Sequence, residues 1–176
     1  MVSLNPSRFS APTPGFGCAR RAPTLQFRAD PQAGIEVCFV PAGWITFQLG
    51  GETVRVGAGE VAVFWAATPH QILAHSEKTD AYFVAALPLA WFVACRLPPA
   101  FAQTLLQGRL LVGAADANPA LDAERFANWE QDAGDGDSEI SLAILLELKA
   151  RLLRLALGGQ ASPVSRPAAT GRATKV

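Results

Sequence analysis

Residues 56–73 read VGAGEVAVFWAATPHQIL, and this stretch decides the fold. A turn of Gly and Ala leads into an apolar run, Val61 to Ala66, and a Thr-Pro-His sequence ending at His70 follows. The run is too short for a typical helix and is rich in Val and aromatic residues, so it predicts a buried strand between two turns. His70 lies just past this strand, where β scaffolds present functional side chains. It is a candidate site residue, with a hydrogen-bonded residue at the rim of the fold as the alternative.

Short strands are predicted along the whole first half of the chain. Apolar or alternating stretches between Gly and Pro residues predict strands at 35–40, 44–49, 52–56, 61–66, 71–74 and 82–87. Gly50 and Gly51 mark a hairpin turn between two of these strands. Residues 81–95 form an apolar stretch that is too short to cross a membrane, and they are interpreted as a core strand followed by a loop. Such a rhythm of short strands is typical of a small β barrel.

The second half of the chain has the apolar period of helices. Pro98 opens a helix that runs to residue 107, with Gly just past its end. Residues 109–112 can add one more strand. Asn118 is a good N-cap for a helix that runs to about Ala133, because its side chain can accept a hydrogen bond from the first turn. The longest helix is predicted at 139–157.

This last helix is nearly all Leu, Ile and Ala apart from a polar stripe of Glu147, Arg151 and Arg154. Glu147 and Arg151 lie one turn apart and can pair. The apolar face is broader than packing against one barrel surface needs. The helix is therefore either a core helix or a dimerisation surface, and in the second case Leu146 and Leu153 are predicted to face outward.

Composition divides the 176 residues into a Pro-rich N-terminal arm at 1–33, a central domain at 34–157 and a disordered tail at 158–176. The net charge at pH 7 is zero, yet both ends are basic, and residues 35–157 hold eight basic and 14 acidic residues. An acidic body is a poor surface for nucleic acid. Three widely spaced cysteines and the lack of a signal pattern indicate a cytoplasmic protein. No catalytic motif is evident, so no enzyme is predicted.

Spacing links the central domain to a known family. Gly59 and His70 are eleven positions apart, as are the first Gly and the His of the second cupin signature. Glu36 and Gly43 have the same spacing as the Glu and the Gly at the end of the first cupin signature. The chain therefore resembles a cupin. The sequence FWAATPHQ, which ends at Gln71, resembles more specifically the N-terminal sensing domain of AraC-type transcription regulators, in the branch similar to the melibiose regulator.

This resemblance covers about residues 34–157 and implies a mainly β fold, a cupin-like barrel (double-stranded β-helix or jelly roll) followed by an α-helical dimerisation segment. It further implies a small-molecule effector that is sugar-like, a homodimer, and contact with DNA only through a helix-turn-helix domain. The chain departs from the family after residue 157, where no helix-turn-helix pair follows. It is accordingly expected to be either a truncated regulator or a stand-alone sensing domain.

A metal-binding cupin uses three or four ligands, and the resemblance places Glu36 and His70 at two of those positions. The two histidines of the first signature are missing, and two ligands rarely hold a transition metal, so no metal or other cofactor is predicted. The same two residues suit a small-ligand pocket if both face the barrel interior, with Trp65 and Tyr82 adding aromatic surfaces. There are two alternatives. One is a metal-dependent cupin enzyme of the sugar isomerase or dioxygenase type, and the other is an interaction module without a ligand.

Overall fold

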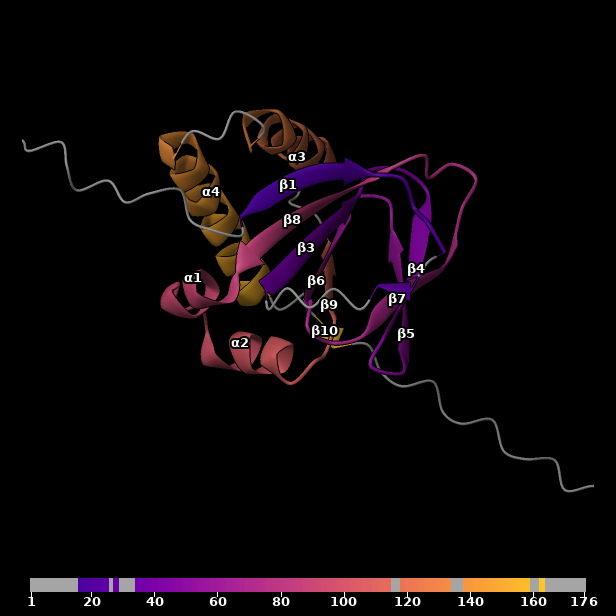
Figure 1. Ribbon diagram of the computed structural model, residues 1–176, viewed down its shortest axis with the longest axis horizontal. Helices are drawn as coiled ribbons and strands as arrows, with labels where there is room; N and C mark the ends of the chain where they lie inside the picture. Colours follow the sequence, from indigo (N-terminus) through magenta and orange to yellow (C-terminus); the bar gives the residue numbers. More distant parts are fainter. Residues whose placement is uncertain are drawn as a thin grey trace, which may run out of the picture.

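The computed structural model describes residues 16–25, 27–28, 34–114, 118–133, 138–158 and 162–163. Most of the predicted arm and tail lie outside these residues. Within them the chain forms two antiparallel β-sheets and four helices (Figure 1). The predicted class, mainly β with C-terminal helices, is confirmed.

The first sheet has six strands in the order β1-β8-β3-β6-β9-β10. Their bounds are β1 Gly17–Arg21, β8 Tyr82–Pro88, β3 Gly34–Val40, β6 Glu60–Trp65, β9 Leu111–Ala114 and β10 Ser162–Pro163. The second sheet has four strands in the order β2-β7-β4-β5. Their bounds are β2 Phe27–Arg28, β7 His70–His75, β4 Trp44–Leu49 and β5 Glu52–Gly57. The six strands predicted between residues 35 and 87 all form, each within one residue of the predicted bounds.

The two sheets lie face to face, and the side chains between them form one of two core clusters. Along β4 every second residue is buried, so that Ile45, Phe47 and Leu49 point toward the six-stranded sheet. The strands β3, β6 and β8 are buried on both faces, because the opposite face of their sheet carries the second core cluster. This double burial explains why these strands have long apolar runs instead of strict alternation.

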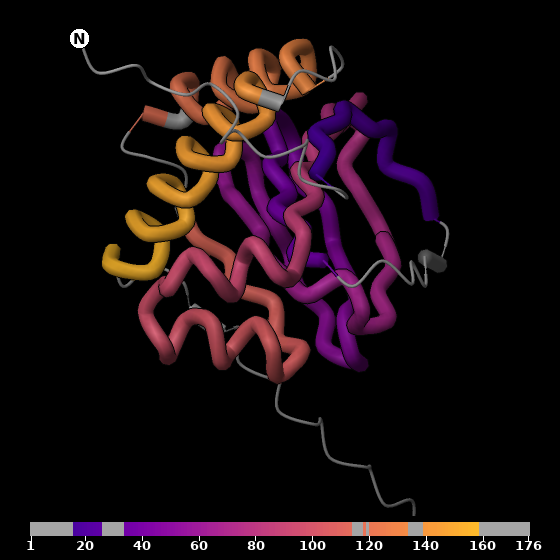
Figure 2. The backbone as a smooth tube through the Cα atoms, turned by 60° about the vertical axis from the view of Figure 1, so that its left-hand side comes forward, coloured from indigo at the N-terminus to yellow at the C-terminus, as the bar shows by residue number. Residues whose placement is uncertain are grey.

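The helices cover the outer face of the six-stranded sheet (Figure 2). They are α1 Leu89–Ala94, α2 Pro99–Leu106, α3 Pro119–Ala133 and α4 Ser138–Leu157. In the described part of the chain no helix is long and apolar enough to cross a membrane.

Helix α1 replaces the loop predicted after Tyr82–Pro88, and this prediction was wrong. Pro88 ends the strand because it has no backbone N–H to donate to a neighbour. The same residue occupies the N-cap position of α1, where a missing donor is tolerated. Phe92, only 1% exposed, then anchors the helix in the core.

Strand β1 was not predicted from the sequence. It pairs in antiparallel fashion with β8, with Gly17 opposite Ala86 and Arg21 opposite Tyr82. Its outer side is held by α3, since the backbone N–H of Arg20 donates to Glu130 Oε1 at 2.9 Å. A Pro-rich segment with little apolar alternation thus becomes an edge strand through partners far away in the sequence.

The predicted polar stripe of the last helix is only partly correct. Arg151 is 6% exposed and binds Asp122 of α3, which is fully buried. Its Nε lies 3.1 and 2.9 Å from the two carboxylate oxygens, and its terminal nitrogen lies 2.8 Å from Oδ2. Glu147, predicted to pair with Arg151, instead accepts a 2.6 Å hydrogen bond from the indole of Trp129. Arg151 is therefore a contact between two helices and not part of an exposed edge.

Candidate functional site

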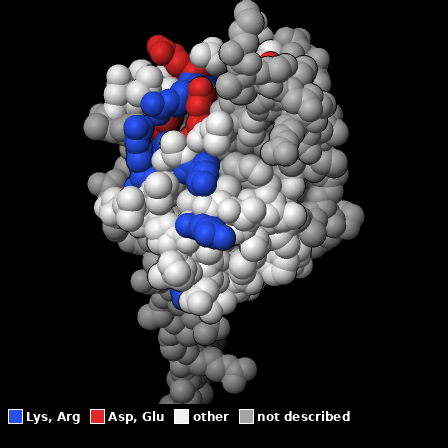
Figure 3. All heavy atoms as spheres, turned by 90° about the vertical axis from the view of Figure 1, so that its left-hand side faces the viewer, with Lys and Arg blue, Asp and Glu red and all other residues white. Residues whose placement is uncertain are grey.

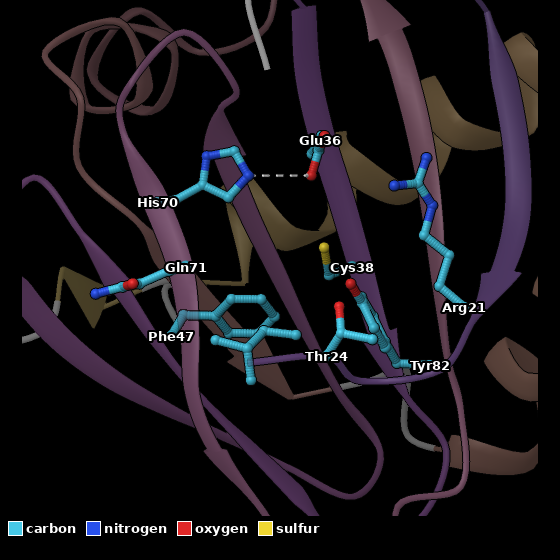
Figure 4. Close-up of a pocket in the computed structure, with 9 residues that line it drawn as sticks. Arg21, Thr24, Glu36, Cys38, Phe47, His70, Gln71 and Tyr82 are labelled. Atoms are coloured by element: carbon cyan, nitrogen blue, oxygen red, sulfur yellow. Dashed lines mark ion pairs between the residues drawn. The ribbon is translucent and has the colours of Figure 1, made fainter. Parts of the chain in front are cut away.

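Glu36, His70 and Tyr82 come from three different strands and line one cavity between the two sheets (Figure 4). The cavity has a volume of about 30 Å³, which is room for roughly two water molecules. Its other lining residues are Arg21, Thr24, Cys38, Phe47, Gln71 and Ile72. A small, mainly polar cavity therefore lies at the place where the sequence predicted a ligand site.

Strand alternation brings these side chains together. On β3, Val37 and Phe39 pack toward the helices, so that Glu36 and Cys38 face the four-stranded sheet. On β8, Tyr82 belongs to the core between the sheets, whereas its neighbour Phe83 belongs to the core beneath the helices. Figure 4 shows Glu36 and Cys38 on one sheet facing His70 on the other.

His70 is held in a defined orientation at the edge of the cavity. It is 7% exposed, its ring packs at 4.8 Å from the ring of Phe64, and its Nδ1 lies 2.9 Å from the carbonyl oxygen of Thr68. Because a carbonyl only accepts, Nδ1 carries the proton in this bond. Nε2 then points to Glu36, with 3.9 Å between Nε2 and Oε2. That distance is too long for a direct hydrogen bond. With the proton on Nδ1, Nε2 and the Glu36 carboxylate are both acceptors, and each can accept a hydrogen bond from a ligand hydroxyl.

Two further groups in the cavity stay protonated at neutral pH. Burial raises the pKa of the Cys38 thiol well above its usual value, and the charge of Glu36 adds to this effect. Burial also raises the pKa of the Tyr82 hydroxyl. The positive charge of Arg21 acts in the opposite direction on both pKa values, so its guanidinium field reaches the cavity. Tyr82 is therefore a hydrogen-bond donor to whatever the cavity holds.

Trp65, the fourth predicted ligand-binding residue, does not line this cavity. Its strand neighbour Phe64 points between the sheets, so Trp65 points to the helix side and packs against the other core cluster. There its indole Nε1 is buried without a hydrogen-bond partner among the described residues. Because adjacent residues of a strand point to opposite faces, the sequence alone indicates that Phe64 and Trp65 lie on opposite faces of β6.

Sequence reasoning missed several of the lining residues. Cys38 is two positions from Glu36 on one strand, so the period of a strand identifies it. Gln71, which follows His70, donates a hydrogen bond to Gln48. Arg21 and Thr24 carry no such signal, because the segment that holds them has no strand pattern.

Leu146 and Leu153, the predicted dimerisation residues, are 56% and 37% exposed on α4. Leu142 and Leu157 are also exposed and continue the same stripe, whereas the opposite side of the helix is buried in the core. Figure 3 shows the left-hand side of the molecule in Figure 1, where charged residues extend from the upper left to the centre and much of the remaining described surface is uncharged. The helix thus has one apolar face in the core and a second one on the surface.

Among the described residues, no group of three or more His, Cys, Asp or Glu side chains is arranged to hold a metal ion. Glu36 and His70 are the two residues that sequence reasoning placed at metal positions of a cupin.

Residues 22–87 match the model of the cupin domain family. Over these residues the fold is that of a cupin domain. The crystal structure of the AraC-like transcriptional activator CuxR has 15% sequence identity and a TM-score of 0.50, over 88% of this chain and 51% of that one. No curated protein sequence matches this chain.

Two structures of ToxT from Vibrio cholerae are similar as well. The apo protein has 8% identity and a TM-score of 0.52, over 81% of this chain and 59% of that one. Wild-type ToxT bound to an unsaturated fatty acid has 7% identity and a TM-score of 0.50, over 89% of this chain and 60% of that one. At such low identities the similarity shows the fold alone. The chain spans between half and three fifths of the length of these neighbours.

Proposed function

We propose that this chain is the ligand-sensing and dimerisation part of an AraC-type transcription regulator. Its effector is a small polar molecule, a sugar or a related polyol, that binds between the two sheets. The observation that carries this proposal is the convergence of Glu36, His70 and Tyr82 on one cavity. The similarity in fold to regulators supports it. DNA is contacted in this proposal through a helix-turn-helix domain outside residues 34–157.

The cavity offers hydroxyl groups both donors and acceptors. His70 Nε2 and Glu36 Oε2 lie 3.9 Å apart and both accept, so two neighbouring hydroxyl groups of a ligand can donate one hydrogen bond to each. Tyr82 adds a donor, and the ring of Phe47 adds an apolar wall. Because the cavity holds roughly two waters, a whole sugar ring enters only if the side chains at its mouth move.

The test is a thermal-shift screen of the whole chain against sugars and polyols. A ligand present at about 100 times its Kd raises the free energy of unfolding by about 2.7 kcal/mol. Substitution His70→Asn keeps a donor toward Thr68 and removes Nε2, and Glu36→Gln removes the carboxylate. We expect both variants to lose the shift.

The matched control is His75→Asn, since the second histidine of the chain is exposed and lies outside the cavity. It should keep the full shift. Hits that survive His70→Asn and Glu36→Gln would place binding elsewhere, and a screen without any hit would favour an interaction module without a ligand. Stoichiometric iron, manganese, nickel or zinc that is lost in His70→Asn but kept in His75→Asn would instead support a metal-dependent cupin enzyme.

The second part of the proposal is a homodimer formed through α4. Its exposed leucines are spaced four, seven and four residues apart, so they form one stripe along the helix. Monomeric proteins rarely leave such a stripe in water. Two copies of α4 packed in antiparallel fashion would bury the stripe of each against the other, as a two-fold interface requires.

A further inference from the structure

Strand β1 brings a cation to the edge of the cavity. Cys18 and Arg20 face α3, where the Cys18 thiol lies 3.9 Å from the carbonyl oxygen of Phe126. Arg21 therefore faces the other way, opposite Tyr82 in the strand register, and lines the cavity. Figure 4 shows its guanidinium on the same side of the sheet as Glu36 and Cys38.

The guanidinium of Arg21 has no ion-pair or hydrogen-bond partner among the residues that the structure describes. It presents its N–H groups as a planar fork, which matches the two oxygens of a carboxylate. A neutral sugar offers no anionic acceptor to this fork. A ligand with a carboxylate would supply the missing partner.

The remaining lining residues define what lies next to the carboxylate. His70 Nε2 and Glu36 Oε2 can accept hydrogen bonds from hydroxyl groups, and Tyr82 can donate one. A dianion such as phosphate fits less well, because Glu36 places a negative charge in the same cavity. The volume of about 30 Å³ also favours a compact group.

We propose that the effector is a hydroxycarboxylate, a small hydroxy acid or a sugar acid, and that Arg21 binds its carboxylate while Glu36 and His70 accept hydrogen bonds from its hydroxyl groups. This inference rests on the proposed effector site and adds the chemical class of its ligand. Arg21 is then the residue that separates acids from neutral polyols.

The experiment measures binding of two matched pairs to the whole chain by calorimetry and thermal shift: glycerate against glycerol, and gluconate against glucose. We expect the acids to bind and their neutral partners to bind at least about tenfold more weakly. Arg21→Gln should weaken binding of the acids at least about tenfold and leave that of the neutral compounds unchanged. Arg21→Lys keeps the charge without the fork and should retain part of the affinity.

Arg20→Gln is the control, since this neighbour on β1 is exposed. It should bind glycerate like the wild type. If Arg21→Gln fails to fold, as judged by circular dichroism, the preference of the wild type between acid and neutral partner still decides the question.

Neutral compounds that bind as tightly as the acids would overturn the inference, as would inorganic phosphate that binds more tightly than glycerate. If that binding is still lost in His70→Asn, the proposed effector site stands and only its ligand class is wrong. If neither the acids nor any sugar binds the wild type, both the inference and the proposed site fail.

Discussion

Thr79 joins several parts of the backbone through one hydroxyl group and is only 3% exposed. Its Oγ1 accepts the N–H of Trp44 at 3.0 Å and lies 3.0 Å from the carbonyl oxygen of Ala42, to which it can donate. Gly43 passes directly beneath this network with a φ of +72°. A Cβ at Gly43 would lie 2.0 Å from Ser76 Oγ and 2.3 Å from Thr79 Oγ1. Both backbone conformation and space therefore require glycine here.

We expect Gly43→Ala to lower the free energy of unfolding by about 2–4 kcal/mol, because a left-handed backbone and a steric clash add together. Urea denaturation of the purified chain measures the loss. Gly17→Ala is the control, since no atom lies within 4 Å of a Cβ at Gly17. A Gly43→Ala variant as stable as Gly17→Ala would show that the turn is looser than described.

The buried thiols make stability depend on pH in the alkaline range. Burial raises the pKa of Cys18 from 9.0 to about 12, and it also raises the pKa of Cys38 well above its usual value. Above pH 9 the unfolded chain loses these protons while the folded chain keeps them. Deprotonation then favours the unfolded state, so stability is complete below pH 9 and falls as the pH rises toward 12.

We expect the free energy of unfolding to fall between pH 8.5 and about 10.5, by up to about 1.4 kcal/mol per pH unit for each thiol, and the urea midpoint to fall with it. Cys38→Ala should have a flatter pH profile than the wild type, whatever its stability at pH 8. Equal slopes in the two proteins would contradict the assignment of the effect to Cys38.

At the scale of elements, helices α3 and α4 are joined by a buried ion pair. Asp122 is fully buried and bonded by Arg151 through two nitrogens, and Arg125 adds a contact at 3.2 Å. A buried carboxylate without its partner is strongly destabilising, whereas the intact pair adds little over an apolar contact of the same volume. The pair therefore fixes how the helices dock more than it adds to stability.

Removal of one partner by Arg151→Met should cost about 3–5 kcal/mol in the free energy of unfolding. The double substitution Asp122→Leu with Arg151→Met should recover much of this loss, because no buried charge is then left unpaired. Arg154→Met, on the exposed side of α4, serves as the control and should change stability by less than about 0.5 kcal/mol. A double variant that is no more stable than Arg151→Met would mean that the two residues do not act as a pair. Chemical denaturation monitored by circular dichroism supplies all four values.

At the scale of the whole molecule, the helical layer has one face on the sheet and one in water. The exposed leucines of α4 lie on the second face. Each leucine removed from water contributes roughly 1.5–3 kcal/mol, and association itself costs an estimated 4–15 kcal/mol. Four leucines per copy, eight in a pair, can therefore offset the cost of forming a dimer.

We expect the wild type to be a dimer at tens of micromolar, and the Leu146→Glu, Leu153→Glu double variant to be a monomer with the same fold. Size-exclusion chromatography with light scattering gives the mass, and circular dichroism reports the fold. Leu106→Glu on α2 is the matched control, since Leu106 is 37% exposed like Leu153. A monomeric wild type would refute the proposal. A double variant that unfolds would make α4 a core helix only.

Sequence by itself determined the strands from β3 to β8 and the helices α2 to α4. These features depend on local period and on turn residues, which nearby residues encode. The helix at Leu89–Ala94 was missed, although its pattern is local, because Pro88 was interpreted as the start of a loop. The position of Trp65 was also open to local reasoning through its neighbour Phe64.

Only the tertiary structure decided the pairing of β1 and the burial of Arg151. Strand β1 forms because the edge of β8 offers unpaired backbone groups and α3 offers Glu130, and neither is visible in residues 17–21. Arg151 is buried because Asp122, 29 positions away, supplies the compensating charge. The same long-range pairing delivers Arg21 to the cavity, so the cation in the candidate site depends on contacts that no local pattern encodes.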